Sequence, residues 1–196
     1  MPTPLQERLR DGGERAGPLD AFRLARRTFM AGERLDMQGM ASELGVNRAT
    51  LYRWVGTKEL LLGEVISSFA SETLRRAREE VPGQGPAYVA AVVERALEQI
   101  HAFEPMRKFL ERDPEYALRV LTSKESTVQL GSIAGMRDLL ADQVATGALE
   151  TPADLDDLAY VIIRIGESFL YSDVITGSEP DVAKAGLMVR LLLGER

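Results

Sequence analysis

The sequence contains no cysteine and only one histidine, His101. Without cysteine the chain has no disulfide bond, no thiolate nucleophile and no thiolate metal ligand. A single histidine also excludes a metal site built from several imidazoles. We find no nucleophile with an adjacent base of the kind that covalent catalysis requires. We therefore expect no enzymatic activity, no metal site and no cofactor.

Long apolar stretches are also missing. No run reaches the roughly 18 apolar residues that a transmembrane helix needs, and the first residues lack the apolar core of a secretory signal. Hydrophobic residues nevertheless make up 45% of the 196 residues and charged residues 28%, which is an ordinary balance for a globular protein. These features predict a cytoplasmic protein without membrane contact.

Charge is distributed unevenly along the chain. The net charge is −6, yet residues 18–58 contain seven Lys and Arg residues against four Asp and Glu residues. A basic block in an acidic chain indicates that this block alone meets a polyanion such as DNA. A solvated charged surface would give the same count, so charge by itself leaves both interpretations open.

Apolar residues recur every three to four positions along most of the chain, with almost no strand signal, which predicts an all-α fold. Turn and capping residues separate the helical segments. Residues 1–17 are rich in Pro, Gly and Arg, and we expect them to form a mobile tail. The predicted helices cover approximately residues 18–31, 37–44, 48–55, 58–80, 87–103, 105–112, 114–122, 127–146, 152–176 and 179–193.

Two of these helices are short and separated by a tight turn. Asp36 can cap the first helix, Gly45 ends it, and Asn47 can cap the second, which runs from Arg48 to Val55. A small turn residue lets two helices cross steeply, as in a helix-turn-helix motif. In that motif the second helix lies in the DNA major groove and its first residues face base edges.

The second short helix offers side chains that suit DNA. Leu51 and Val55 should face the protein core. The residues left for the outer faces are Arg48, Ala49, Thr50, Tyr52 and Arg53. Arginine can bind guanine through two hydrogen bonds, threonine can contact thymine, and tyrosine can bond to a phosphate. Lys58, at the start of the following helix, is placed to bind a phosphate. Two short core helices with a polar face remain the alternative.

Several motifs occur here at a specific spacing, namely Ala41, Gly45-Val46, Thr50-Leu51-Tyr52 and Thr57-Lys58-Glu59-Leu60. Together with Phe29 in the preceding helix, this combination resembles the DNA-binding domain of the TetR family of bacterial repressors over about residues 18–65. The sequence departs from the family pattern at Trp54, Val55 and Gly56, where His, Phe and Pro are common.

The resemblance implies an all-helical homodimer whose N-terminal domain binds a double-stranded DNA operator and whose C-terminal helices hold a small-molecule effector. It also implies that Tyr52 and Lys58 contact phosphates and that Arg48 and Thr50 read bases. Supporting contacts would come from Gln38, Asn47 and Ala49. The corresponding division of the chain is a tail over 1–17, a DNA-binding domain over 18–60, and a regulatory and dimerisation domain over 61–196.

The helix predicted over 152–176 is apolar on all sides, which is typical of a buried helix. The last helix repeats the pattern with Val182, Ala185, Val189 and Leu192. Two such helices per subunit predict a four-helix dimer interface. The core of a purely monomeric bundle would require the same apolar residues and remains the alternative.

A polar stripe crosses that apolar helix at Arg164, Glu167 and Tyr171. Arg164 and Glu167 could bind the polar head of an effector, or they could form an ion pair within the helix or between subunits. The further candidates for effector contacts are His101, Phe109 and Tyr116, for which a place in the core or on the surface is the alternative.

The segment Gly166–Asp181 also looks similar to the C-terminal domain of actinobacterial regulators of quorum-signal lactone degradation. That similarity implies a lactone or an acyl chain as the effector. The sequence thus predicts a ligand-responsive repressor that a small apolar effector releases from a pseudo-palindromic operator. The alternative is a helical bundle that binds proteins or small molecules and has no DNA function.

Overall fold

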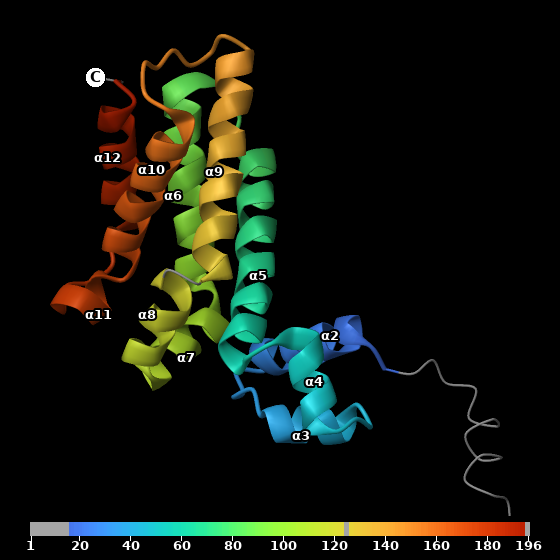
Figure 1. Ribbon diagram of the computed structural model, residues 1–196. Helices are drawn as coiled ribbons and strands as arrows, with labels where there is room; N and C mark the ends of the chain where they lie inside the picture. The colour runs from blue at the N-terminus through green and yellow to red at the C-terminus, as the bar shows by residue number, and fades with distance from the viewer. Residues whose placement is uncertain (1–15, 124–125, 195–196) are drawn as a thin grey trace, which may run out of the picture.

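The computed structural model describes residues 16–123 and 126–194, and every regular element within these ranges is an α-helix (Figure 1). The prediction of an all-α fold is therefore confirmed. Apart from its last two residues, the predicted mobile tail over 1–17 lies outside the described residues. The helices are α2 (Pro18–Met30), α3 (Met37–Glu43), α4 (Arg48–Val55), α5 (Lys58–Glu80), α6 (Gly85–Ala102), α7 (Glu104–Arg112), α8 (Pro114–Thr122), α9 (Thr127–Ala145), α10 (Leu155–Leu170), α11 (Ser172–Thr176) and α12 (Val182–Leu192).

Helices α2, α3 and α4 form a small N-terminal unit at one end of the molecule, next to the first turns of α5 (Figure 1). Three side chains cap α3, α4 and α5: Asp36, Asn47 and Thr57 each accept a hydrogen bond from a backbone N–H group two or three residues further on. The turn between α3 and α4 contains Gly45, whose φ of 65° lies in the left-handed region that glycine tolerates. Leu51 of α4 is fully buried in the core. Local chemistry thus produces the predicted helix-turn-helix arrangement.

The rest of the chain forms a bundle in which α5, α6, α9, α10 and α12 run alongside one another, with the shorter α7 and α8 near the N-terminal unit (Figure 1). Glycines let α5 and α9 approach closely. A Cβ atom on Gly63 would lie 2.7 Å from Oγ1 of Thr127, and one on Gly131 would lie 2.6 Å from Oγ of Ser67. Helix α5 is therefore packed tightly into the bundle, while its first turn adjoins the N-terminal unit.

The apolar segment predicted as one helix over 152–176 forms two helices, so that prediction is wrong in its bounds. Helix α10 begins only after Asp154, whose side chain accepts hydrogen bonds from the backbone N–H groups of Asp156 and Asp157. It ends before Tyr171, which leaves the helical conformation (φ −106°, ψ 21°) and separates α10 from α11. Periodicity could not show this break, because apolar residues continue on both sides of it.

The last helix also begins later than predicted. Asp181 is its N-cap and accepts a hydrogen bond from the backbone N–H group of Lys184, so the helix starts at Val182. Gly177 ends the preceding helix α11 with a φ of 73°. The polar segment between Gly177 and Asp181 is therefore a loop. After this loop, α12 packs against α10 and α6.

Candidate DNA-binding helix and effector cavity

Helix α4 carries most of the residues that the sequence assigns to DNA. Leu51 anchors it in the core, and Trp54 and Val55 are partly buried against the same core. The exposed residues at its start are Asn47, Arg48 and Ala49, and the half-buried ones are Thr50 and Tyr52. The first turn of α4 is therefore the part of the helix most open to solvent.

Two of these side chains contact each other. Nη2 of Arg48 donates a hydrogen bond to the Tyr52 hydroxyl at 3.2 Å, and the guanidinium carbon lies 5.2 Å from the centre of the Tyr52 ring. Their four-residue spacing places both on one side of the helix. Oδ1 of Asn47 accepts a hydrogen bond from the backbone N–H group of Thr50 at 2.7 Å, which leaves the side-chain amide hydrogens of Asn47 for another partner. Helix α4 thus offers a cation and a hydroxyl together on one side, and an amide at its N-cap.

The two predicted contacts outside α4 lie on neighbouring helices. Gln38 is exposed in the first turn of α3. Lys58, the first residue of α5, is half-buried, and its ammonium nitrogen lies 5.7 Å from the centre of the Tyr116 ring. The Tyr116 hydroxyl donates a hydrogen bond to Oε1 of Glu59 at 3.3 Å. Burial, together with the charge of Glu59, raises the pKa of Tyr116 to about 12. Lys58 therefore lies where the N-terminal unit meets α8.

A cavity of about 780 Å³ lies within the helical bundle, a size that is typical of small-molecule sites. Helices α5, α6, α9 and α10 form most of its walls, and α2 contributes side chains at one end. The lining is mainly apolar and includes Phe69, Leu97, Phe103, Met136 and Ile162. Such a cavity can hold an apolar molecule, with polar recognition confined to a few side chains.

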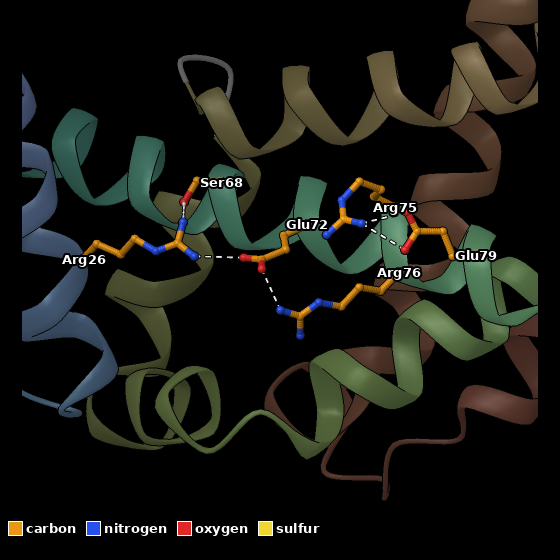
Figure 2. Close-up of polar contacts among 6 residues, drawn as sticks. All are labelled: Arg26, Ser68, Glu72, Arg75, Arg76 and Glu79. Atoms are coloured by element: carbon orange, nitrogen blue, oxygen red, sulfur yellow. Dashed lines mark hydrogen bonds and ion pairs between the residues drawn. The ribbon is translucent and has the colours of Figure 1, made fainter.

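Charged side chains line the cavity where α2 meets α5 (Figure 2). Arg26 of α2 donates hydrogen bonds to Oγ of Ser68 at 3.0 Å and to Oε2 of Glu72 at 2.8 Å. Arg76, one turn further along α5, donates to the other oxygen of Glu72 at 2.6 Å. The guanidinium carbon of Arg26 also lies 4.1 Å from the centre of the Phe69 ring. The N-terminal unit is thus tied to the bundle at the wall of the cavity.

A second polar group lies in the wall formed by α10. Glu167 accepts a hydrogen bond from Arg164 at 2.6 Å and another from the side-chain amide of Gln129 on α9. Its side chain is only 15% exposed. This burial raises the pKa of Glu167 above its ordinary value, against the opposing effect of Arg164. Burial likewise raises the pKa of the Tyr171 hydroxyl, with a smaller effect from Glu167. An ion pair within one helix, one of the alternatives left open by the sequence, is therefore present.

The predicted effector residues do not gather in one place. Glu167 and Tyr171 line the large cavity, and Arg164 bonds to Glu167 from outside this lining. Two others, Phe109 and Tyr116, line a smaller pocket of about 140 Å³ between the N-terminal unit and α7 and α8. The remaining one, His101, is exposed near the end of α6.

Sequence reasoning missed several charged residues of the large cavity, among them Arg26, Glu72 and Arg76. In the sequence, Arg26 is one of several basic residues off the apolar stripe of its helix. The four-residue spacing of Glu72 and Arg76 is visible and indicates an ion pair on one helix. Nothing in the sequence shows that Arg26, 46 residues before Glu72, shares the same carboxylate.

Aromatic rings connect the large cavity with the smaller pocket and form what we call the aromatic cluster. Phe69 and Phe103 line the cavity, and their ring centres are 5.2 Å apart. Phe29 of α2 lies 5.9 Å from Phe69 and 6.0 Å from Phe109. Phe109 in turn lies 6.1 Å from Tyr116. These spacings are typical of favourable ring pairs. The cluster therefore packs α2 against the cavity wall and, through Phe109, connects it to Tyr116 of α8.

Comparison with known proteins places this architecture in a family. The model of the Tetracyclin repressor-like, C-terminal domain matches residues 84–194, more than half of the chain. The structure of the TetR-family transcriptional repressor QsdR from R. erythropolis is similar, with a TM-score of 0.86 and 30% sequence identity over 90% of this chain and 94% of that chain. No curated protein sequence matches.

Two more distant structures share the fold alone. The fatty acid degradation regulator FadR from Bacillus halodurans has a TM-score of 0.53 and 15% identity, with 92% of this chain and 96% of that chain covered. The transcriptional regulator FadR from Bacillus subtilis, in complex with stearoyl-CoA, has a TM-score of 0.53 and 12% identity, with 91% and 98% covered. At these identities the likeness supports the arrangement of helices only.

A helix-turn-helix unit joined to a bundle with a ligand-sized cavity is the architecture of a ligand-responsive transcriptional regulator. The chain belongs to the TetR family of transcriptional regulators. Members of this family are generally DNA-binding repressors that respond to ligands and are typically not enzymes. Within the described residues, no group of three or more His, Cys, Asp or Glu side chains is placed to hold a metal ion. In the same part of the chain, no helix is both long and apolar enough to cross a membrane.

The buried carboxylate on α10 makes stability depend on pH. Because the pKa of Glu167 is raised in the folded state, its ionisation destabilises the fold as the pH rises above the ordinary glutamate value of 4.5. Glu167→Gln should therefore be more stable than wild type at neutral pH, and the difference should shrink toward zero as the pH falls to about 4.5. Urea unfolding at a series of pH values measures this difference.

The exposed residue Glu150 provides the control, and Glu150→Gln should show no such gap. A Gln variant of Glu167 that is less stable than wild type at neutral pH would contradict the account. That result would mean that the bonds from Arg164 and Gln129 outweigh the cost of burying the charge.

Proposed function

We propose that the protein is a homodimeric repressor that binds a pseudo-palindromic operator and releases it when a small, mainly apolar molecule enters the cavity. The observation that carries this proposal is the position of Arg26, which lines the cavity and bonds to α5. Its helix, α2, also packs against α4. A molecule in the cavity would therefore touch the helix that supports the proposed recognition helix.

We assign DNA recognition to α4 lying in the major groove. Arg48 and Thr50 would meet base edges, because arginine can bind O6 and N7 of guanine and threonine can contact the thymine methyl group. Tyr52 and Lys58 would bond to phosphates and fix the register of the helix. The supporting contacts would come from Gln38, Asn47 and Ala49, all of which are exposed.

The proposed division of the chain is a DNA-binding domain over 18–60 and a regulatory and dimerisation domain over 61–196. Helix α5 crosses this boundary without a break, from Lys58 to Glu80. A displacement of α5 would therefore reach the first turn beside α4 without passing through a flexible linker. A ligand lowers operator affinity if it binds better to a form in which the recognition helices have the wrong separation.

We place the dimer interface on α10 and α12. These helices pack against each other at one edge of the bundle (Figure 1). They expose large apolar side chains, among them Tyr160 (51% exposed), Leu187 (50%) and Leu191 (55%). Apolar side chains gathered on neighbouring helices are typical of an interaction surface. Two copies would form a four-helix interface and present two α4 helices to half-sites about 34 Å apart, one turn of the duplex.

The cavity lining favours an effector with a substantial apolar part. Aromatic and aliphatic side chains make up most of the wall, and charged side chains, among them Arg26, Glu72 and Glu167, are a minority. The resemblance of Gly166–Asp181 to regulators of quorum-signal lactone degradation supports an acyl lactone, or a molecule derived from one, as the effector class.

The assignment of α4 can be tested with a duplex that the wild-type protein selects from a random pool. Arg48→Ala should weaken binding by about 1–3 kcal/mol and relax the sequence preference at one base pair, because it removes a base contact. Tyr52→Phe should weaken binding to all duplexes alike, because it removes a phosphate contact. Gel shifts at one fixed salt concentration measure both effects.

Arg23→Ala is the matched control, since Arg23 is an exposed arginine of α2 that pairs with Asp20 on its own helix. The Arg23→Ala variant should bind the selected duplex with the same affinity as wild type. If Arg48→Ala and Tyr52→Phe also bind as wild type does, α4 is not the recognition helix. If the wild-type protein enriches no duplex, the DNA function itself is wrong and a small-molecule-binding bundle remains.

The dimer interface makes a separate prediction. Leu187→Asp should produce a 21.6 kDa monomer at micromolar concentration, because it places a charge in an apolar interface. Leu130→Asp is the control, since Leu130 is 65% exposed but lies on α9, outside the α10–α12 face. Light scattering should give the dimer mass for wild type and for Leu130→Asp. A monomeric wild type, or a dimer that survives Leu187→Asp, would refute the assigned interface.

A further inference from the structure

Among the described residues, two arginines at the α2 end of the cavity share one carboxylate (Figure 2). Glu72 accepts from Arg26 through one oxygen at 2.8 Å and from Arg76 through the other at 2.6 Å. Neither arginine therefore has the two-bond pairing that a carboxylate can provide. A further bond of Arg26 goes to the neutral hydroxyl of Ser68. Two cations and one anion stand together here, with guanidinium hydrogens left for another acceptor.

Other arginines on the cavity wall are matched more fully by acidic side chains. Arg95 pairs with both Glu80 and Glu98, at 2.6 Å and 3.1 Å. Arg78 has a carboxylate to itself, that of Asp142. Excess positive charge on the wall is thus concentrated where α2 meets α5.

Charge of the opposite sign occurs in the wall formed by α10. Glu167 is a carboxylate that Arg164 and Gln129 already bond. An anionic group on a ligand would be repelled there and attracted to the α2 end. Because most of the remaining lining is apolar, a ligand with one charged head and one apolar tail has a single favourable direction in the cavity.

We propose that the cavity binds an apolar molecule with a carboxylate head, and that this head binds Arg26 and Arg76 in place of Glu72. The inference rests on the proposed function of the cavity as the effector site, and it adds the charge and the direction of the ligand. Hydrogen bonds between arginine and carboxylate are charge-assisted and directional. A hydroxy acid would therefore bind better than the neutral lactone with the same carbon skeleton.

A carboxylate at this place would also act on α2. Arg26 holds α2 to α5 through its bonds to Ser68 and Glu72 and through its position over the Phe69 ring. A ligand that takes over the guanidinium group replaces these bonds between helices with bonds to a separate molecule. Helix α2 is then attached to α5 by fewer contacts, and α4, which packs on α2, can change position. The carboxylate head would thus both fix the ligand in the cavity and cause the protein to release the operator.

The test compares decanoate with methyl decanoate, which share an acyl chain and differ in charge, by titration calorimetry at neutral pH. Wild type should bind decanoate at least about tenfold more tightly than the ester, as expected for charge-assisted hydrogen bonds. Arg76→Gln should remove this preference while leaving the affinity for the ester unchanged. Glu72→Gln should increase the affinity for decanoate, because it removes the competing carboxylate.

Arg75→Gln is the matched control for these variants. Arg75 is adjacent to Arg76 on the same helix and forms its own pair with Glu79 at 2.7 Å, but it does not line the cavity (Figure 2). The Arg75→Gln variant should prefer decanoate over methyl decanoate as strongly as wild type does. Thermal unfolding of each variant verifies that the fold is retained.

Equal affinities of wild type for the acid and the ester would overturn the carboxylate assignment, although binding of both would leave the cavity as an effector site. The assignment would also be overturned if Arg76→Gln preferred decanoate over the ester as strongly as Arg75→Gln does. If neither ligand binds, the inference fails as well. Operator binding by the same ligand-free protein then decides separately whether the proposed function stands.

Discussion

The attachment of α2 to α5 is the contact on which the rest of the molecule depends. This contact joins the helix-turn-helix unit to the bundle that contains the cavity. The contact combines a packed part, the rings of Phe29 and Phe69, with an oriented polar part, in which Arg26 bonds to Ser68 and Glu72. Packing supplies most of the stability of such a contact, because a half-exposed ion pair contributes little to it. The polar part instead fixes one orientation, which a ligand can exchange for another at modest cost.

A second connection runs through α8. The ring of Phe109 joins the aromatic cluster to Tyr116, which lies beside Lys58 and donates a hydrogen bond to Glu59. The first turn of α5 is therefore held from the regulatory side as well as from α2. A regulator needs two arrangements of similar free energy rather than one rigid form. Both connections exist alongside a hydrophobic core that includes buried side chains of the N-terminal unit and of the bundle.

Local sequence was enough to predict the N-terminal unit. Asp36 and Asn47 cap the helices that their positions indicated, and Gly45 provides the turn. These features depend on residues two to four positions apart, so the information lies within each segment. The pair of Arg164 and Glu167, three residues apart on α10, was for the same reason among the alternatives that the sequence offered.

The cavity could not be predicted in the same way. Its charged end joins Arg26 to a carboxylate 46 residues later, and its lining draws on seven helices, α2 and α5 to α10. Residues such as Phe109 and Tyr116 have the composition expected of a binding site, yet tertiary packing places them in a different pocket. The break at Tyr171 was hidden because apolar residues continue beyond it, at Val174 and Ile175, although Ile175 is exposed in the structure. Positions set by packing between distant segments leave little trace in a single sequence.

The central claim is that a ligand in the cavity moves the recognition helices of a dimer, and the chain is well suited to a direct measurement of that motion. Because the protein has no cysteine, Arg53→Cys places a single spin label on an exposed position of α4 in each protomer. Pulsed electron paramagnetic resonance then measures the distance between the two labels, and so between the two α4 helices. The account predicts one narrow distance distribution on the operator and a shifted or broader one when decanoate is added to the free dimer. An identical distribution with and without ligand, at a concentration that releases the operator, would contradict it.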